Sequence, residues 1–234
     1  MAPKSTPRDA RARRFRRRLL AWFRREGREL PWRATRDPYR ILVSEVMLQQ
    51  TQVARVVEFY PRFLHRFPTL RHLAAARPAR VREAWEGLGY YRRAANLLCL
   101  AREVTARYGG AIPAAPEALL RLPGLGRYTA GAVASFAFER RTAAVDTNVA
   151  RVLRRAFHPR LPAGARGERR IWETAGALLP RRGATVWAFN QALMELGALV
   201  CTARVARCDV CPVVKVCLTG EERLRQTAST DSTD

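Results

Sequence analysis

The stretch LPGLGRYTAGA at residues 122–132, followed by VDTN at residues 145–148, decides the expected fold of this chain. Gly124 and Gly126 permit positive φ and carry no Cβ, so backbone N–H groups beside them can approach an anion closely. The small residues after Arg127 indicate a helix whose N-terminus adds partial positive charge to those amides. Loop and helix start would therefore hold a phosphate without reading base sequence. The alternative is a helix–turn–helix corner whose glycines serve only tight packing.

Apolar residues recur at helical spacing over most of the chain. Phe15, Leu19 and Trp22 fall at i, i+4 and i+7, with arginines between them. Asp37-Pro38 is typical of an N-cap with proline at the first helical position, and it begins the helix that carries Glu45. Strand-like alternation bounded by hairpin turns is absent. We therefore predict an all-α fold.

The charge of the chain indicates a polyanionic partner. Lys and Arg number 43 against 20 Asp and Glu, which gives a formal net charge of +23. Only Lys4 and Lys215 are lysines, so the charge is carried by arginine, whose planar fork suits bidentate phosphate contacts. No segment is long and apolar enough to span a membrane, and the basic start at residues 11–18 lacks the apolar core of a signal peptide. We expect a cytoplasmic, nucleoid-associated protein.

Four cysteines near the C-terminus are spaced C-x6-C-x2-C-x5-C. Disulfides are disfavoured without an export signal, and zinc usually takes two chelating pairs across a longer loop. The array instead suits four thiolates around a cubane 4Fe-4S cluster, with zinc as the weaker alternative. Cys99 stands alone in a helical stretch and is expected in the core. The predicted cluster ligands are Cys201, Cys208, Cys211 and Cys217.

These motifs together resemble the endonuclease III and MutY superfamily of DNA glycosylases, and within it the MutY branch of adenine glycosylases. The resemblance covers roughly residues 12 to 220. It implies two helical lobes with a central cleft and a helix-hairpin-helix at about residues 118–136. The segments that carry it, besides those above, are LPWR at 30–33, DPY at 37–39, SEVMLQQT at 44–51 and GLGYY at 87–91.

The resemblance also implies domain boundaries. Residues 1–36 and 146–220 would form a discontinuous domain that holds the iron-sulfur cluster, and residues 37–145 a helical barrel domain. Residues 221–234 are expected to be a disordered tail. Proteins of the MutY branch continue into a domain resembling Nudix hydrolases that helps recognise 8-oxoguanine. This sequence stops soon after the cysteines, so we expect a short form with altered selectivity.

By the same resemblance, Glu45 and Asp146 are the catalytic carboxylates. Glu45 lies in an apolar helical run, where desolvation would raise its pKa and keep a proton for the leaving base. Asp146 would stay ionised beside the sugar, supported by Asn148. The structural alternatives are an exposed helix glutamate and a helix N-cap. Tyr128 occupies the position where strand-nicking relatives carry a Schiff-base lysine, so we predict a monofunctional enzyme.

The remaining candidates would contact the flipped base or the DNA. Trp32, Arg33, Leu48 and Gln191 match positions around the extrahelical adenine. Gln50 and Tyr90 match residues that insert near the opposing guanine, although Tyr90 could simply pack. The predicted DNA-binding set is Gln49, Gln50, Tyr90, Leu122, Gly124, Leu125, Gly126, Thr129, Arg204 and Arg207.

The expected function is hydrolytic removal of adenine mispaired with 8-oxoguanine or guanine. The partner would be double-stranded DNA with a mismatched or damaged base, bound by a monomer without membrane contact. A separate abasic-site endonuclease would act downstream. One alternative is a thymine or uracil mismatch glycosylase, because such relatives also keep Glu, Tyr and Asp at these positions. A second is a non-catalytic iron-sulfur DNA-binding protein.

Overall fold

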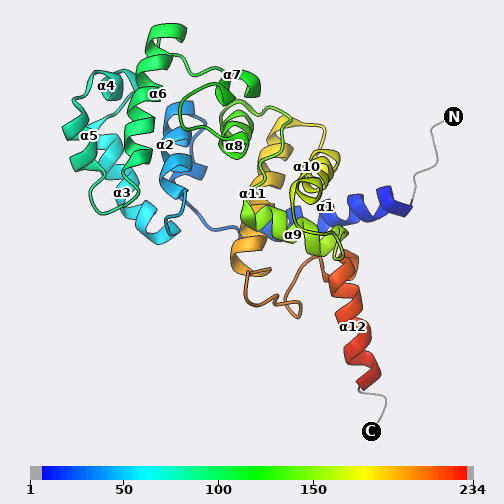
Figure 1. The fold of residues 1–234 in the computed structure, drawn as a ribbon. Coiled ribbons are helices and arrows are strands. Elements are labelled where there is room, and N and C mark those ends of the chain that lie inside the picture. The colour runs from blue at the N-terminus through cyan, green and yellow to red at the C-terminus, as the bar shows by residue number, and fades with distance from the viewer. Residues whose placement is uncertain (1–6, 231–234) are drawn as a thin grey trace, which may run out of the picture. The chain divides into compact units, whose positions relative to one another are not determined.

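A computed structural model describes residues 7–230 and divides the chain into two compact units (Figure 1). The central unit runs from Glu29 to Thr142. The terminal unit combines Met1–Arg28 with Ala143–Asp234. The boundaries therefore fall at 28/29 and 142/143, rather than at the 36/37 and 145/146 expected from the sequence.

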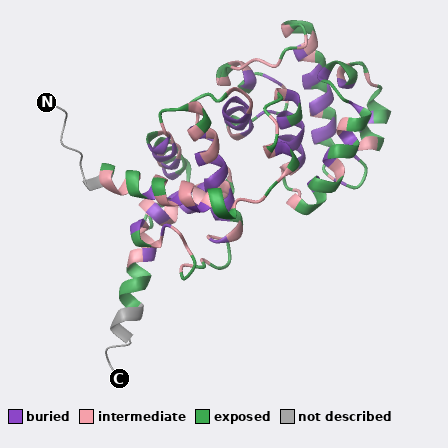
Figure 2. Cartoon of the chain, turned by 180° about the vertical axis from the view of Figure 1, so that it is seen from behind, coloured by how far each residue is buried: buried purple, intermediate pink, exposed green. Residues whose placement is uncertain are grey.

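The central unit is built around one buried helix, α2 (Pro38–Leu48). Asp37 caps it by accepting a hydrogen bond from the Arg40 N–H at 3.0 Å, as the Asp-Pro pair predicted. Burial extends along almost the whole of α2 (Figure 2), which explains its run of apolar residues. Helices α3, α6 and α8 pack against it. The other elements are η1 (Pro31–Arg33), α3 (Val53–Arg66), α4 (Leu70–Ala75), α5 (Pro78–Ala84), α6 (Arg92–Tyr108), α7 (Pro116–Leu120) and α8 (Arg127–Phe138).

The terminal unit has its own core, formed where α11 packs against α1 and α9. Phe15 and Leu19 of α1 and Phe189 of α11 are fully buried there, as the spacing of the apolar residues predicted for α1. Arg28 ties the segment after α1 to α11, because its guanidinium forms a two-pronged ion pair with the buried Glu195 at 2.7 and 2.9 Å. The elements are α1 (Pro7–Glu26), α9 (Thr147–Phe157), α10 (Ala165–Leu178), α11 (Gly183–Leu199), η2 (Val214–Val216) and α12 (Leu218–Thr230).

The all-α prediction is confirmed, since residues 7–230 contain no β-strand and only one isolated bridge, between Cys201 and Ala206. None of the helices in this range combines the length and apolar character needed to cross a bilayer. Two expectations were wrong. Residues 221–230 continue the helix α12 instead of forming a disordered tail, and 231–234 lie outside the described residues. Cys99 is exposed, because it lies on the outward face of α6 between buried Leu98 and Leu100.

Candidate active site and nucleic-acid interface

Glu45 is a buried carboxylate with a hydroxyl donor. It lies on α2 with only 3% of its surface exposed, which excludes the exposed-glutamate alternative. Tyr128, in the first turn of α8, donates a hydrogen bond from its Oη to Glu45 Oε2 at 2.7 Å. The packing of α8 against α2 makes this contact possible across 83 residues of sequence. A buried acid with one oriented donor is suited to proton transfer.

Thr129 and Gln49 form the next contact between the same two helices. Gln49, the C-cap residue of α2, points its Nε2 toward Thr129 Oγ1 at 3.4 Å. The Thr129 side chain is 3% exposed, so its hydroxyl faces protein.

The predicted hairpin loop lies between α7 and α8. The side chains of Leu122 and Leu125 are buried, and their N–H groups bond to Leu119 O at 3.0 Å and Leu122 O at 3.3 Å. These two leucines hold the loop together. Packing therefore explains why residues 122 and 125 are leucine, but it does not explain why residues 124 and 126 are both glycine.

Gly124 and Gly126 differ in why they must be glycine. Gly124 has φ +76°, and a Cβ there would lie 2.8 Å from Asn96 Cβ, so the fold itself requires glycine. Gly126, the N-cap of α8, has φ −88° and nothing within 4 Å of a built Cβ. Since no internal neighbour demands glycine at 126, its bare backbone suits close approach by an external group such as phosphate.

Gln50 and Tyr90 share an unusual backbone conformation. Gln50 has φ +55° and Tyr90 has φ +49°, in the left-handed region that non-glycine residues rarely adopt. Both are exposed, Tyr90 to 60%, which argues against simple packing of the tyrosine. Two exposed side chains on strained loop backbones are typical of a recognition surface.

The expected base-pocket residues are distributed over both units. Trp32, Arg33 and Leu48 belong to the central unit. Trp32 is buried, and its ring packs edge-on against that of Tyr60, with 5.6 Å between the ring centroids. Leu48 and Arg33 are half-buried. Gln191 belongs to the terminal unit and is 5% exposed on α11.

Asp146 begins α9 and is fixed by two donors. As N-cap it accepts from the Val149 N–H at 2.7 Å, and its other oxygen accepts from Asn148 Nδ2 at 2.9 Å. The N-cap alternative is therefore correct in geometry. It is also compatible with a catalytic role, because the two donors fix the orientation of the carboxylate.

Arg151 extends this chain of hydrogen bonds to the cysteine loop, and sequence reasoning missed it. Its Nη2 donates to Asn148 Oδ1 at 2.8 Å and to Gly197 O at 2.7 Å, and its Nε donates to Cys201 O at 2.8 Å. The one available signal was its position three residues after Asn148, on the same helical face.

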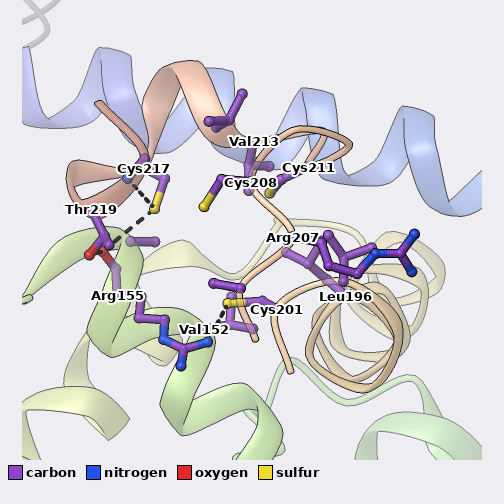
Figure 3. Close-up of a pocket in the computed structure, with 15 residues that line it drawn as sticks. Val152, Arg155, Leu196, Cys201, Arg207, Cys208, Cys211, Val213, Cys217 and Thr219 are labelled. Atoms are coloured by element: carbon purple, nitrogen blue, oxygen red, sulfur yellow. Dashed lines mark hydrogen bonds between the residues drawn. The ribbon is translucent and has the colours of Figure 1, made fainter. Parts of the chain in front are cut away.

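The four cysteines line one pocket of the terminal unit (Figure 3). Burial raises the pKa of Cys211 to about 12, and the other three sulfurs add to that shift. Burial likewise raises the pKa of Cys217. A positively charged centre bound by the thiolates would reverse both shifts. Apolar Val152, Leu196 and Val213 complete the wall.

Donors point at the sulfurs from outside the cysteine loop. Arg155 Nη1 lies 3.3 Å from Cys201 Sγ, and the Gly220 N–H lies 3.4 Å from Cys217 Sγ (Figure 3). Such N–H donors stabilise thiolate ligands. In residues 7–230 no three His, Cys, Asp or Glu side chains converge as ligands of a single metal ion. Four cysteine thiols around one pocket are a donor set that suits an iron-sulfur cluster.

Arg204 and Arg207 lie on the same loop and are exposed. The Arg207 N–H bonds to Val200 O at 3.1 Å, which anchors the loop at the end of α11. Their side chains are therefore available for phosphate contacts.

Comparison with known proteins places the chain in a family. Residues 43–175 match the model of the HhH-GPD superfamily base excision DNA repair protein. An adenine DNA glycosylase of Mycobacterium tuberculosis (strain ATCC 25618 / H37Rv) is 49% identical over 196 residues, which cover 83% of this chain and 64% of that protein. The adenine DNA glycosylase of Rattus norvegicus is 46% identical over 214 residues, which cover 87% of this chain and 41% of that protein. The chain thus spans between two fifths and two thirds of the length of these relatives.

A solved structure agrees with this placement. The structure of a thermostable thymine-DNA glycosylase superimposes with a TM-score of 0.84 at 31% identity, covering 93% of this chain and all of that one. The sequence match spans both the segment of Glu45 and Tyr128 and the segment of Asp146 and Asn148. The chain belongs to the HhH-GPD superfamily of base excision DNA repair proteins.

Proposed function

We propose that this chain is a monofunctional DNA glycosylase that hydrolyses the N-glycosidic bond of adenine mispaired with 8-oxoguanine or guanine. The observation that carries the proposal is the buried Glu45 carboxyl with Tyr128 as its hydrogen-bond donor. The identity of 46–49% to adenine DNA glycosylases supports the choice of base.

The chemistry follows from the two carboxylates. Glu45, in its protonated form, gives a proton to the departing adenine, whose bond to C1′ breaks with its electron pair going to the base. Asp146, ionised beside the sugar, stabilises the positive charge that develops there. Glu45 as carboxylate then takes a proton from the water that attacks C1′. The products are free adenine and an abasic site.

Binding to double-stranded DNA is supported by the bare backbone at Gly126, the exposed Arg204 and Arg207, and the net charge of +23. Trp32, Arg33, Leu48 and Gln191 would surround the extrahelical base, and Gln50 and Tyr90 would meet the opposing strand. We propose that one copy of the chain acts alone and hands the abasic site to a separate endonuclease.

A 4Fe-4S cluster on Cys201, Cys208, Cys211 and Cys217 is supported by the shared pocket and the N–H donors around the sulfurs. The cluster would hold the loop that carries Arg204 and Arg207. The chain's own groups supply the proton and the negative charge for the reaction.

Thymine mispaired with guanine is the second candidate substrate. It is supported by the likeness to the solved thymine-DNA glycosylase, with a TM-score of 0.84 at 31% identity.

One experiment separates the candidates. Excess enzyme is incubated with duplexes holding adenine opposite 8-oxoguanine, adenine opposite guanine, thymine opposite guanine or uracil opposite guanine, and strand breaks are scored with and without alkali. Alkali-dependent breaks at adenine support the proposal, and breaks only at thymine or uracil support the second candidate. Absence of breaks in every duplex would contradict both. Breaks without alkali, or a covalent complex trapped by borohydride, would contradict the monofunctional assignment.

A further inference from the structure

Arg93 is a buried arginine that has no part in the chemistry proposed above. It lies in the first turn of α6 and is 8% exposed, yet its guanidinium serves as donor to many neighbouring oxygens. An arginine is seldom buried unless its donors are used. The oxygens that accept its hydrogen bonds therefore indicate the role of Arg93.

Its first set of partners lies at the end of α2 and in the turn that follows. Nη1 donates to the carbonyls of Val46 at 3.1 Å, Met47 at 2.7 Å and Gln49. Nη2 donates to Thr51 Oγ1 at 3.0 Å. These carbonyls belong to the last turn of a helix, where they lack intrahelical partners and where a cation is favoured by the helix dipole.

Its second set lies in the GLGYY segment. Nη2 also donates to Leu88 O at 3.2 Å and Gly89 O at 3.0 Å. The guanidinium carbon stands 5.5 Å from the Trp85 ring centre and 5.4 Å from that of Tyr90. One side chain thus bonds five carbonyls and one hydroxyl, in the last turn of α2, in the turn that follows it and in the GLGYY segment.

The two loops contain the two strained, exposed residues described above. Gln50 lies between Gln49 and Thr51, and Tyr90 follows Gly89 directly, and both have positive φ. A non-glycine residue in this conformation is strained, and the conformation persists only where surrounding contacts offset the strain. Arg93 supplies such contacts on either side of Gln50 and immediately before Tyr90.

We propose that Arg93 is a positioning residue that locks the Gln50 and Tyr90 loops together as one rigid probe of the base opposite the target and joins that probe to the helix carrying Glu45. The inference rests on the proposed function, in which Gln50 and Tyr90 meet the opposing strand. Because the bonded carbonyls of Val46 and Met47 directly follow Glu45, a shift of the probe would be transmitted to the acid.

The test compares Arg93→Met, Arg93→Lys and a matched control. Arg93→Met keeps much of the side-chain volume and removes every donor, whereas Arg93→Lys keeps the charge without the planar fork. Arg102→Met is the control, since Arg102 lies on the same helix and bonds the carbonyls of Ala74 and Ala76 away from both loops.

The first readout is amide hydrogen exchange. Arg93→Met should accelerate exchange at least tenfold in residues 49–51 and in residues 87–91 together, and Arg93→Lys should do so partially. Arg102→Met should leave both loops unchanged. Protection that persists in either loop of Arg93→Met would overturn the proposal. Should Arg93→Met not fold, Arg93→Lys and Thr51→Val decide: both must loosen residues 49–51, and the lysine variant must loosen 87–91 as well.

The second readout is discrimination between opposing bases. In Arg93→Met, the ratio between the single-turnover rates opposite 8-oxoguanine and opposite guanine should fall at least tenfold. Affinity for the duplex should change little, because the phosphate contacts are untouched. Unchanged discrimination with loosened loops would overturn the proposed coupling. If the unsubstituted chain excises no adenine, the proposed function fails on that result, and the exchange experiment still decides whether Arg93 locks the loops.

Discussion

Tyr128 Oη stands 2.7 Å from Glu45 Oε2 and donates a hydrogen bond to it, which joins the first turn of α8 to the middle of α2. The acid is thus held by the same helix whose N-terminus follows the glycine loop. A phosphate bound at that loop and a proton-transferring carboxyl would be positioned by one rigid element.

Tyr128→Phe should slow base excision by about 10 to 100-fold, because Tyr128 stabilises the Glu45 carboxylate that forms as the proton leaves, and a hydrogen bond to a charged group contributes about 1.5–3 kcal/mol. Glu45→Gln should abolish excision, since an amide cannot transfer the proton. Thr105→Val is the control, because its hydroxyl donates to Ala101 O at 2.8 Å within α6 and does not involve the acid. Single-turnover rates on a mismatched duplex measure all three. A Tyr128→Phe rate equal to that of the unsubstituted chain would show that the contact does not serve the reaction.

Arg151→Gln should lower excision at least tenfold, because it removes the donors that hold Asn148 and the Cys201 carbonyl. Arg154→Gln is the matched control one turn along α9, since Arg154 bonds the carbonyls of Leu161 and Pro162 away from Asp146. Excision rates are compared at equal folded fraction, checked by circular dichroism. Equal losses in the two variants would assign Arg151 to general stability of the helix.

Gly126→Ala should weaken duplex binding with little change in the free energy of unfolding, because a Cβ at residue 126 meets only open space. Gly124→Ala should instead destabilise the central unit by about 1 kcal/mol or more, from its positive φ and its contact with Asn96. Salt-dependent binding and urea unfolding separate the two effects. Unweakened binding by Gly126→Ala would remove the phosphate from this loop.

The central unit should lose stability as the pH rises above 10. Burial raises the pKa of Tyr60 from its ordinary value to about 12, and it raises the pKa of Tyr39 further. Both phenols are thus harder to ionise in the folded chain than in the unfolded chain. The stabilisation is complete below pH 10, the unfolded value, and is lost as the pH passes through the folded values.

The two phenylalanine variants should differ at pH 8. Tyr39→Phe loses a 2.7 Å bond to Phe67 O and should cost about 1 kcal/mol. Tyr60→Phe should be neutral or stabilising, because the Tyr60 hydroxyl is buried without a hydrogen-bond partner in the described part of the chain. Urea unfolding at pH 8 and pH 11 tests both statements. If the variant with both substitutions loses as much free energy of unfolding between pH 8 and pH 11 as the unsubstituted chain does, then titratable groups other than these two tyrosines cause the loss.

The purified protein should be brown, with broad absorbance near about 400 nm, as thiolate-bound iron-sulfur centres are. Cys211→Ala should lose this colour and melt at a lower temperature, whereas Cys99→Ala should change neither, since Cys99 is exposed on α6. Iron and sulfide analysis quantifies the cluster. A colourless protein with one zinc per chain would contradict the iron-sulfur assignment.

Sequence could predict the structure of those residues whose conformation or burial depends on their near neighbours in the chain. The helix starts at Pro38 and Arg127 follow from Asp37-Pro38 and from the glycine loop, because caps and turns depend on neighbours in the chain. Phe15 and Leu19 are buried as their helical spacing predicted. The prediction that Cys99 lies in the core was wrong, because a residue with apolar neighbours on both sides in the sequence can face either the core or the solvent on a helix.

Sequence by itself therefore determined the all-α fold, the glycine loop before α8 and the cysteine array, and its family resemblance nominated Glu45 and Asp146 as the two carboxylates. Tertiary structure decided what surrounds them: that Glu45 is buried and meets Tyr128, that Arg151 joins Asn148 to the cysteine loop, and that Arg93 bonds two loops at once. The reason is physical. Each of these arrangements includes a contact between residues distant in sequence, and such a pairing depends on helix packing, which periodicity alone does not specify.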